Sequence, residues 1–108
     1  MTGMLFPCPY LEKPVELTEE RADHIAERHP DLLPLHLEKV GETLQSPDQV
    51  RRSVRFSNAR LFSRWIANSG KYIVVVVMSE PHHHDRHWII TAYQSRRLSE
   101  GVVEWSRA

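Results

Sequence analysis

The chain has 108 residues, of which 41% are apolar and 26% are charged, a composition typical of one globular domain that excludes a multidomain enzyme. It is too rich in core-forming residues for a disordered chain, and it has no fibrous bias. The formal net charge is zero, but residues 49–79 carry six cations and no acid, which leaves a formal charge of −6 on the rest of the chain.

Residues 1–16 are predicted to form an extended N-terminal arm, because they hold the only proline-dense stretch of the chain. They contain neither a basic leader nor a long apolar stretch, which argues against a secretory signal. The single cysteine, Cys8, excludes an internal disulfide and agrees with a reducing compartment. We therefore expect a cytoplasmic protein whose single domain spans residues 17–108.

Two helices are predicted in the first half of the chain. The first, from Thr18 to His29, begins where the Thr18 hydroxyl can cap a free backbone amide, and it ends before Pro30. The second, from Pro34 to Gln45, follows from apolar residues spaced by four, three and four positions. These apolar residues are Leu33, Leu37, Val40 and Leu44.

After Pro47 the apolar period changes to two, which predicts strands. The predicted strands are Val50–Val54, Arg60–Ala67, Lys71–Ser79, Arg86–Gln94 and Val102–Trp105. Their short connections, such as the turn at residues 68–70, favour antiparallel neighbours, and the valine run at residues 74–77 is typical of a central strand. We thus predict an α+β domain in which two N-terminal helices pack on a four- to five-stranded antiparallel meander sheet.

The longest apolar run, residues 72–78, belongs to one of these strands. It is far shorter than the roughly 20 residues of a membrane-spanning helix, so no membrane partner is expected.

Cations gather on one flank of the first predicted helix. At about 100° per residue, Arg21, His24 and Arg28 lie together, whereas the acidic residues fall on the far side. An anion could bind to this flank, and the neighbouring cations would favour the neutral form of His24, which can act as a base. His29 lies at the end of the apolar helix face, where it could serve in catalysis or be a buried capping group.

The strands contribute three polar candidates. Arg64, Thr91 and Tyr93 interrupt otherwise apolar strands, and polar groups in such positions need partners. With the cations of residues 49–79 they could bind an anion on one face of the domain. The alternative is that Arg64 is a surface arginine and Thr91 an ordinary β-branched strand residue. The cations of residues 49–79 would then be solvated on an exposed sheet face.

A histidine cluster lies between the third and fourth predicted strands; its members are His82, His83, His84, Asp85 and His87. Such residues can bind a divalent metal, but a loop lacks the rigid spacing of zinc motifs, so we expect weak binding at most and no cofactor. The chain also has no glycine-rich phosphate loop and no Gly-x-Ser-x-Gly turn. This argues against nucleotide-dependent transferases and serine hydrolases.

Four short motifs occur in order along the chain, and these are His24-Ile25-x-x-Arg28-His29-Pro30, Thr43-Leu44-x-x-Pro47-Asp48-x-Val50, Leu61-Phe62-x-Arg64 and Ile90-Thr91-Ala92-Tyr93. Together they resemble small domains of the barnase, EndoU, colicin and RelE-like nuclease superfamily, and most closely its phage-associated and toxin-like branch. The resemblance runs from about Leu17 to Trp105. It implies two helices followed by a four- or five-stranded antiparallel sheet.

The resemblance further implies a metal-independent endoribonuclease with RNA as substrate and an acidic antitoxin or immunity protein as a partner. The residues that it assigns to the site are His24, Arg28, His29, Arg64, Thr91 and Tyr93. The histidines would act as acid or base, the arginines would hold phosphate, and Thr91 or Tyr93 would donate hydrogen bonds. The alternatives are a non-catalytic RNA- or protein-binding module and a metal-binding protein built on the loop histidines.

Overall fold

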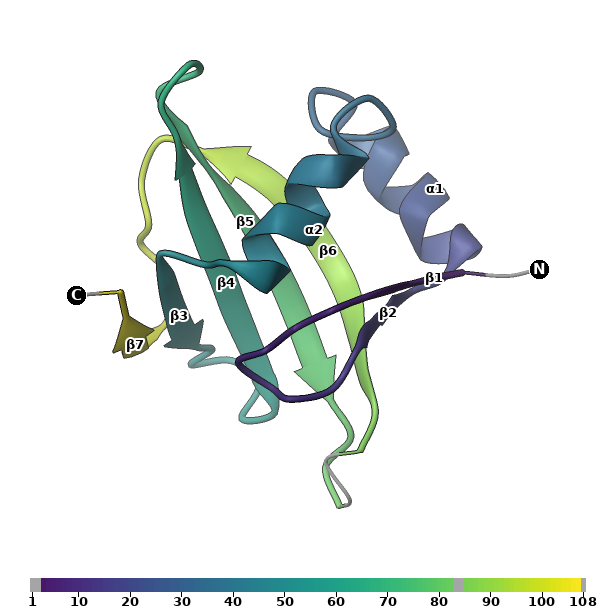
Figure 1. Cartoon of the computed structure of the whole chain (residues 1–108), viewed down its shortest axis with the longest axis vertical. Coiled ribbons are helices and arrows are strands. Elements are labelled where there is room, and N and C mark those ends of the chain that lie inside the picture. Colours follow the sequence, from purple (N-terminus) through teal and green to yellow (C-terminus); the bar gives the residue numbers. More distant parts are fainter. Residues whose placement is uncertain (1–2, 83–84, 108) are drawn as a thin grey trace.

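In the computed structural model, which describes residues 3–82 and 85–107, seven strands form one sheet and two helices lie on one side of it (Figure 1). In chain order the elements are β1 (Met4–Phe6), β2 (Val15–Leu17), α1 (Glu19–Arg28), α2 (Leu37–Gln45), β3 (Gln49–Arg52), β4 (Ala59–Ile66), β5 (Lys71–Ser79), β6 (His87–Ser95) and β7 (Val102–Ser106). The strand order across the sheet is β1-β2-β6-β5-β4-β3-β7. Within the described ranges, no helix is both long and apolar enough to cross a membrane.

The predicted four- to five-stranded antiparallel meander is wrong. The segment expected to be an extended arm contributes β1 and most of β2, and β2 pairs in parallel with β6 where Glu16 lies opposite Trp88. At the other edge, β7 pairs with β3 and not with β6, which precedes it in the chain. Strands of three residues are too short to show a period of two, and a pairing between distant segments leaves no local signal. The sheet is therefore mixed and has seven strands.

The central part of the sheet follows the local patterns. Strands β3 to β6 are antiparallel neighbours in chain order, and β5, which carries the valine run, lies in the middle. Helix α1 begins where predicted, because the Thr18 hydroxyl accepts a hydrogen bond of 3.1 Å from the Arg21 N–H. Helix α2 begins at Leu37, three residues later than predicted, because residues 31–36 form turns.

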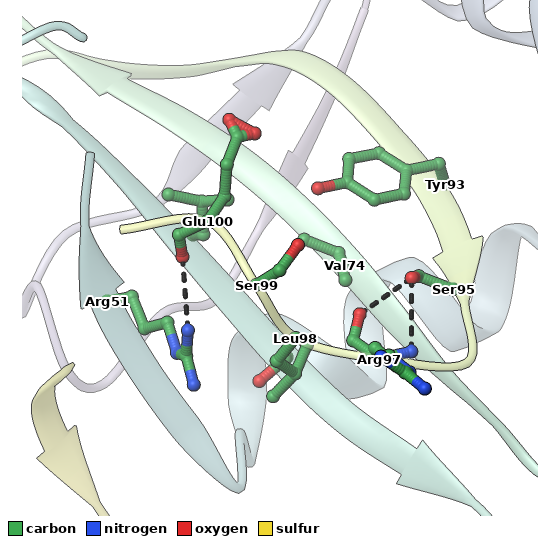
Figure 2. Close-up of a pocket in the computed structure, with 10 residues that line it drawn as sticks. Arg51, Val74, Tyr93, Ser95, Arg97, Leu98, Ser99 and Glu100 are labelled. Carbon is green, nitrogen blue, oxygen red and sulfur yellow. Dashed lines mark hydrogen bonds between the residues drawn. The ribbon is translucent and has the colours of Figure 1, made fainter. Parts of the chain in front are cut away.

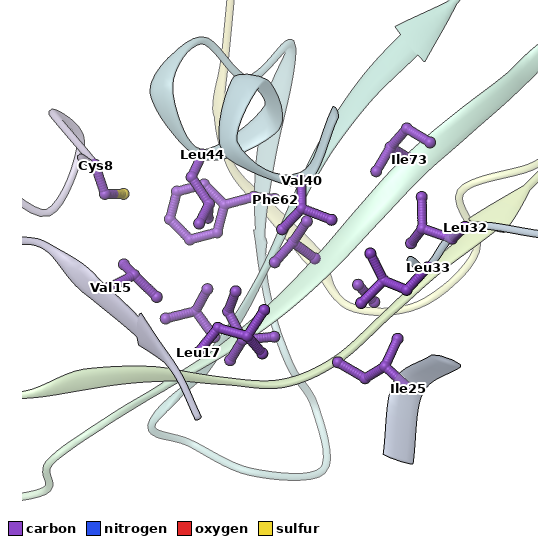
Figure 3. Packing of buried hydrophobic residues seen from close by; sticks show 14 of the residues in the cluster. Cys8, Val15, Leu17, Ile25, Leu32, Leu33, Val40, Leu44, Phe62 and Ile73 are labelled. Carbon is purple, nitrogen blue, oxygen red and sulfur yellow. The ribbon is translucent and has the colours of Figure 1, made fainter. Parts of the chain in front are cut away.

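The core lies between the helices and one face of the sheet (Figure 3). On that face Phe62 and Ile73 of the sheet are buried together with Ile25 of α1 and Leu44 of α2. The N-terminal segment closes the same core, to which β2 contributes Val15 and Leu17 and the connection between β1 and β2 contributes Cys8. Burial raises the pKa of the Cys8 thiol, which favours its uncharged form.

We call the opposite side of the sheet the open face. Side chains alternate along a strand, and the register aligns Ser63, Val74 and Tyr93 in one row of this face. The next rows are Leu61–Val76–Thr91 on one side and Trp65–Tyr72–Ser95 on the other. Residues 96–101, which connect β6 to β7, cross this face and leave Leu61, Ser63 and Val74 buried (Figure 2). Only part of the open face is therefore covered.

An ionic cluster joins β7 to the rest of the sheet. The Glu104 carboxylate accepts hydrogen bonds from Arg52 at 2.9 Å, from Arg60 at 2.8 Å and from the Tyr10 hydroxyl. Burial by itself would raise the pKa of Glu104, but the bonds from Tyr10, Arg60 and Arg52 outweigh it and lower the pKa. Burial and the bond to Glu104 raise the pKa of Tyr10 to about 12.

Glu104→Gln is expected to destabilise the protein by about 1.5–3 kcal/mol at neutral pH, because it removes charge-assisted hydrogen bonds. The folded state lowers the Glu104 pKa, so this contribution is present above the ordinary pKa of a glutamate and is lost as the pH falls through the folded-state value. Urea unfolding at neutral pH and at about pH 3 measures both effects. An unchanged difference between wild type and variant at the two pH values would contradict this role.

Candidate functional site

A polar cavity of about 100 Å³ lies on the open face, beneath residues 96–101 (Figure 2). Its walls come from strands β3 to β6 and from the crossing segment, and the residues are Arg51, Leu61, Ser63, Val74, Tyr93, Ser95, Arg97, Leu98, Ser99 and Glu100. The set combines two cations, one carboxylate and several hydroxyls. Such a combination is suited to a small polar or anionic group.

Arg51 is held in place by two acceptors on this face. Its Nε donates to Gln49 Oε1 at 2.7 Å, and its Nη1 donates to the Glu100 carbonyl at 3.3 Å. Gln49 and Arg51 are two residues apart on β3, so their side chains point to the same face. The guanidinium is therefore pre-oriented toward the cavity.

The crossing segment is fixed at both ends. At its start the Ser95 hydroxyl donates to the Arg97 carbonyl at 2.6 Å and accepts from the Arg97 N–H at 3.3 Å. At its end Gly101 has a φ of 83°, and a Cβ there would lie 2.7 Å from the Arg52 carbonyl oxygen. Only glycine adopts this turn without strain. These constraints hold Arg97 and Glu100 over the sheet.

His29 and Tyr93 meet at the edge of β6. His29 follows the last residue of α1, and its backbone N–H donates to the Ile25 carbonyl. The centroids of the His29 and Tyr93 rings are 5.9 Å apart, with an interplanar angle of 38°. Burial, followed by the charge of Glu100, raises the pKa of Tyr93, so this phenol remains protonated at neutral pH and has a proton to donate in a hydrogen bond.

The structure brings together only part of the predicted site. Thr91 lies on the open face, one row from Tyr93, and His24 and Arg28 are exposed on α1 one helical turn apart. Arg64 lies on the opposite face of the sheet, aligned with Ile73, and its Nη1 donates to the Ser46 carbonyl at 2.6 Å. That bond satisfies a carbonyl at the C-terminal end of α2, a position that favours cations. Arg64 therefore caps the C-terminal end of α2 and lies on the other side of the sheet from the cavity that Tyr93 lines.

The cations of residues 49–79 are likewise divided between the two faces. Arg52 and Arg60 bind Glu104, and Arg64 caps α2, whereas Arg51 faces the cavity. The second cation of the cavity, Arg97, comes from outside that segment. Arg51, Arg97 and Glu100 were not predicted as site residues, because nothing local in the sequence shows that residues 96–101 cross the sheet.

The histidine cluster is also divided. His87 belongs to β6, is buried, and its Nδ1 is hydrogen-bonded to the Ser79 hydroxyl at 2.7 Å. His82 is exposed, and Asp85 lies 3.9 Å from the Lys13 ammonium. His83 and His84 lie outside the described residues, and in the described part of the chain no group of three or more His, Cys, Asp or Glu side chains is arranged to hold a metal ion.

No family model, curated protein or solved structure matches this chain.

Proposed function

We propose that this chain is an endoribonuclease that cleaves RNA without a metal ion, at the junction of α1, β6 and residues 96–101. The observation that carries the proposal is the contact between His29 and Tyr93, beside a cavity that Arg51 and Arg97 line. The resemblance of the motifs to the barnase, EndoU, colicin and RelE-like superfamily supports it. The protein would act in the cytoplasm, where RNA is available and Cys8 stays reduced.

The reaction needs a proton acceptor, a proton donor and stabilisation of the phosphorane charge. The RNA 2′-oxygen attacks the neighbouring phosphorus, and the bond from phosphorus to the 5′-oxygen breaks. The products are a 2′,3′-cyclic phosphate and a free 5′-hydroxyl. His29 would take the 2′-hydroxyl proton or give a proton to the leaving 5′-oxygen, because an imidazole can do either near neutral pH.

The other side chains would bind the phosphate. Tyr93 would donate a hydrogen bond to a non-bridging oxygen, since its raised pKa keeps it protonated. Arg51 and Arg97 would balance the developing negative charge. His24 and Arg28, which are exposed on α1, would supply the second proton-transferring group and a further cation along the RNA.

A non-catalytic RNA-binding module of the same fold is the second candidate. It is favoured by the position of Arg51, whose Nε and Nη1 already donate to Gln49 and to the Glu100 backbone and so are less available to a phosphorane. A module of this kind would bind RNA on the open face and release it intact.

Single-stranded RNA is expected to be cut in the presence of EDTA, and a 2′-deoxy substitution at the cut site is expected to abolish cutting. The reason is that the attacking nucleophile is the 2′-hydroxyl and no metal-bound water takes part. Electrophoresis of end-labelled RNA, with identification of the 2′,3′-cyclic end, is the measurement. RNA that is bound but stays intact would favour the binding module, and cleavage that stops with EDTA would contradict the metal-free mechanism.

A further inference from the structure

An aromatic pair lies on the open face beyond the cavity. Trp65, at the end of β4, and Tyr72, at the start of β5, are directly opposite each other in the register. Their ring centroids are 4.9 Å apart with an interplanar angle of 65°, an edge-to-face arrangement that holds both rings in place. The Trp65 residue is nevertheless 45% exposed. A flat apolar ring is thus supported from the side while part of its surface remains open to solvent.

The register places this pair beside the candidate site. Tyr72 lies opposite Ser95, and two residues further along β5 Val74 lies opposite Tyr93. Trp65 on β4 and Tyr93 on β6 are two strand spacings apart, about 10 Å, and two residues apart along the strands, about 7 Å, so their backbones are separated by about 12 Å, comparable to two nucleotides. Ser95 is itself part of the cavity wall. An RNA strand whose phosphate lies at Tyr93 would therefore pass over residues 96–101, which bury Ser63 and Val74, and bring a base about two nucleotides away to Trp65.

The charges around the pair favour a nucleic acid over an apolar protein surface. Arg51 and Arg97 line the cavity, and so does the row next to the pair, Ser63, Val74 and Tyr93, of which Ser63 and Val74 are buried beneath residues 96–101. The carboxylate next to Trp65 is that of Asp48, which accepts a hydrogen bond from the Trp65 N–H at 2.7 Å and lies 3.6 Å from Arg107. Arg107 thus balances the charge of Asp48. The other carboxylate, Glu100, belongs to the cavity wall.

We infer that Trp65, supported by Tyr72, is a base-stacking subsite for single-stranded RNA, about two nucleotides from the phosphate bound at Tyr93. This inference rests on the proposed function and specifies whether the RNA substrate is single-stranded or double-stranded. A base reaches an exposed ring only when it is free of a duplex, so the substrate is single-stranded. Stacking on a π-face tolerates every base, so this subsite contributes affinity and position and little sequence preference.

The experiment measures binding separately from cleavage. The probe is a short, fluorescently labelled single-stranded RNA with 2′-O-methyl groups throughout, which cannot be cut through its 2′-oxygens. Trp65→Leu is expected to raise its Kd by about 5- to 150-fold, the range for loss of one stacked base. The matched control is Trp105→Leu, because Trp105 lies against Tyr10 on the core side and is expected to change Kd by less than about twofold.

A scan of single abasic positions in the same probe tests the subsite on the wild-type protein. An abasic site at one position is expected to weaken binding as much as Trp65→Leu does. The Trp65→Leu variant is then expected to bind this abasic probe no more weakly than it binds the intact probe. Trp65→Tyr keeps an aromatic ring and is expected to retain most of the affinity. Circular dichroism confirms the fold of each variant, and the abasic scan decides the question if Trp65→Leu does not fold.

The outcomes separate this inference from the proposed function. Equal Kd values for Trp65→Leu and Trp105→Leu, or a scan in which no position matters, would overturn the subsite even if RNA is cut. A dimer in sedimentation equilibrium that Trp65→Leu converts to monomers would also overturn it, since a second copy would then cover the ring. Weakened binding by Trp65→Leu without any cleavage of unmodified RNA supports the subsite and overturns the endoribonuclease. Failure of the wild-type protein to bind the probe overturns the subsite, and cleavage of unmodified RNA then decides the proposed function by itself.

Discussion

Replacement of His29 by alanine is expected to lower the rate of RNA cleavage by about 100- to 10,000-fold, the range for loss of a general acid or base. His29 is the imidazole that contacts Tyr93 at the cavity edge, and alanine cannot exchange a proton at neutral pH. The fold is expected to survive, because the side chain is only half-buried and the hydrogen bond to the Ile25 carbonyl comes from the backbone. Single-turnover cleavage of end-labelled RNA in EDTA measures the effect.

Two further histidine variants make this result specific. His36→Ala is the matched control, because His36 lies in the turn before α2 and is expected to leave the rate unchanged. His24→Ala tests the second proton-transferring group and is expected to slow cleavage as well. The affinity for the uncleavable 2′-O-methyl RNA is expected to change little in His29→Ala, since the arginines remain. Cleavage by His29→Ala at the wild-type rate would exclude His29 as acid or base.

Replacement of Phe62 by alanine is expected to destabilise the protein by about 3–5 kcal/mol, a large part of the roughly 5–15 kcal/mol that holds a small domain folded. Phe62 is 0% exposed, lies on β4 next to the central strand, and packs edge-to-face on Tyr10 at 5.8 Å. Its removal therefore leaves a cavity where the sheet, α2 and the N-terminal segment meet. The shift of the urea unfolding midpoint is the measurement.

Phe56→Ala is the control for this substitution. Phe56 is 51% exposed in the connection between β3 and β4, so its replacement is expected to change the free energy of unfolding by less than about 0.5 kcal/mol. Similar midpoints for the two variants would contradict the placement of Phe62 at the centre of the core.

The local elements could be predicted from the sequence because their signals are local. A capping hydroxyl at Thr18 and a proline at position 30 bound α1. The alternation of apolar residues after Pro47 marks β3 to β6, and apolar residues at consecutive positions 74–77 require a strand covered on both faces. Each of these features depends on neighbours within a few residues, so it is present in the sequence before any tertiary contact forms.

The edges of the sheet were decided only in the tertiary structure. Strand β2 is three residues long and pairs with β6, which is about seventy residues away in the chain. Strand β7 pairs with β3 after residues 96–101 have crossed the open face from the end of β6. Such pairings depend on where the chain returns after two helices and a crossing segment. No local pattern distinguishes a returning segment of three residues from an extended arm.

The candidate site shows the same division between local and tertiary information. Alternation correctly indicated that Tyr93 and Thr91 share a face within β6, and that His29 ends the apolar side of α1. It could not tell that Arg64 lies on the opposite face from Tyr93, since this depends on the register between β4, β5 and β6. A shift of one residue in this register would have placed Arg64 on the same face as Tyr93. The sequence by itself thus determined which side chains share a face within each element, and only the packing of the elements decided which faces meet and that residues 96–101 bring Arg97 and Glu100 over the sheet.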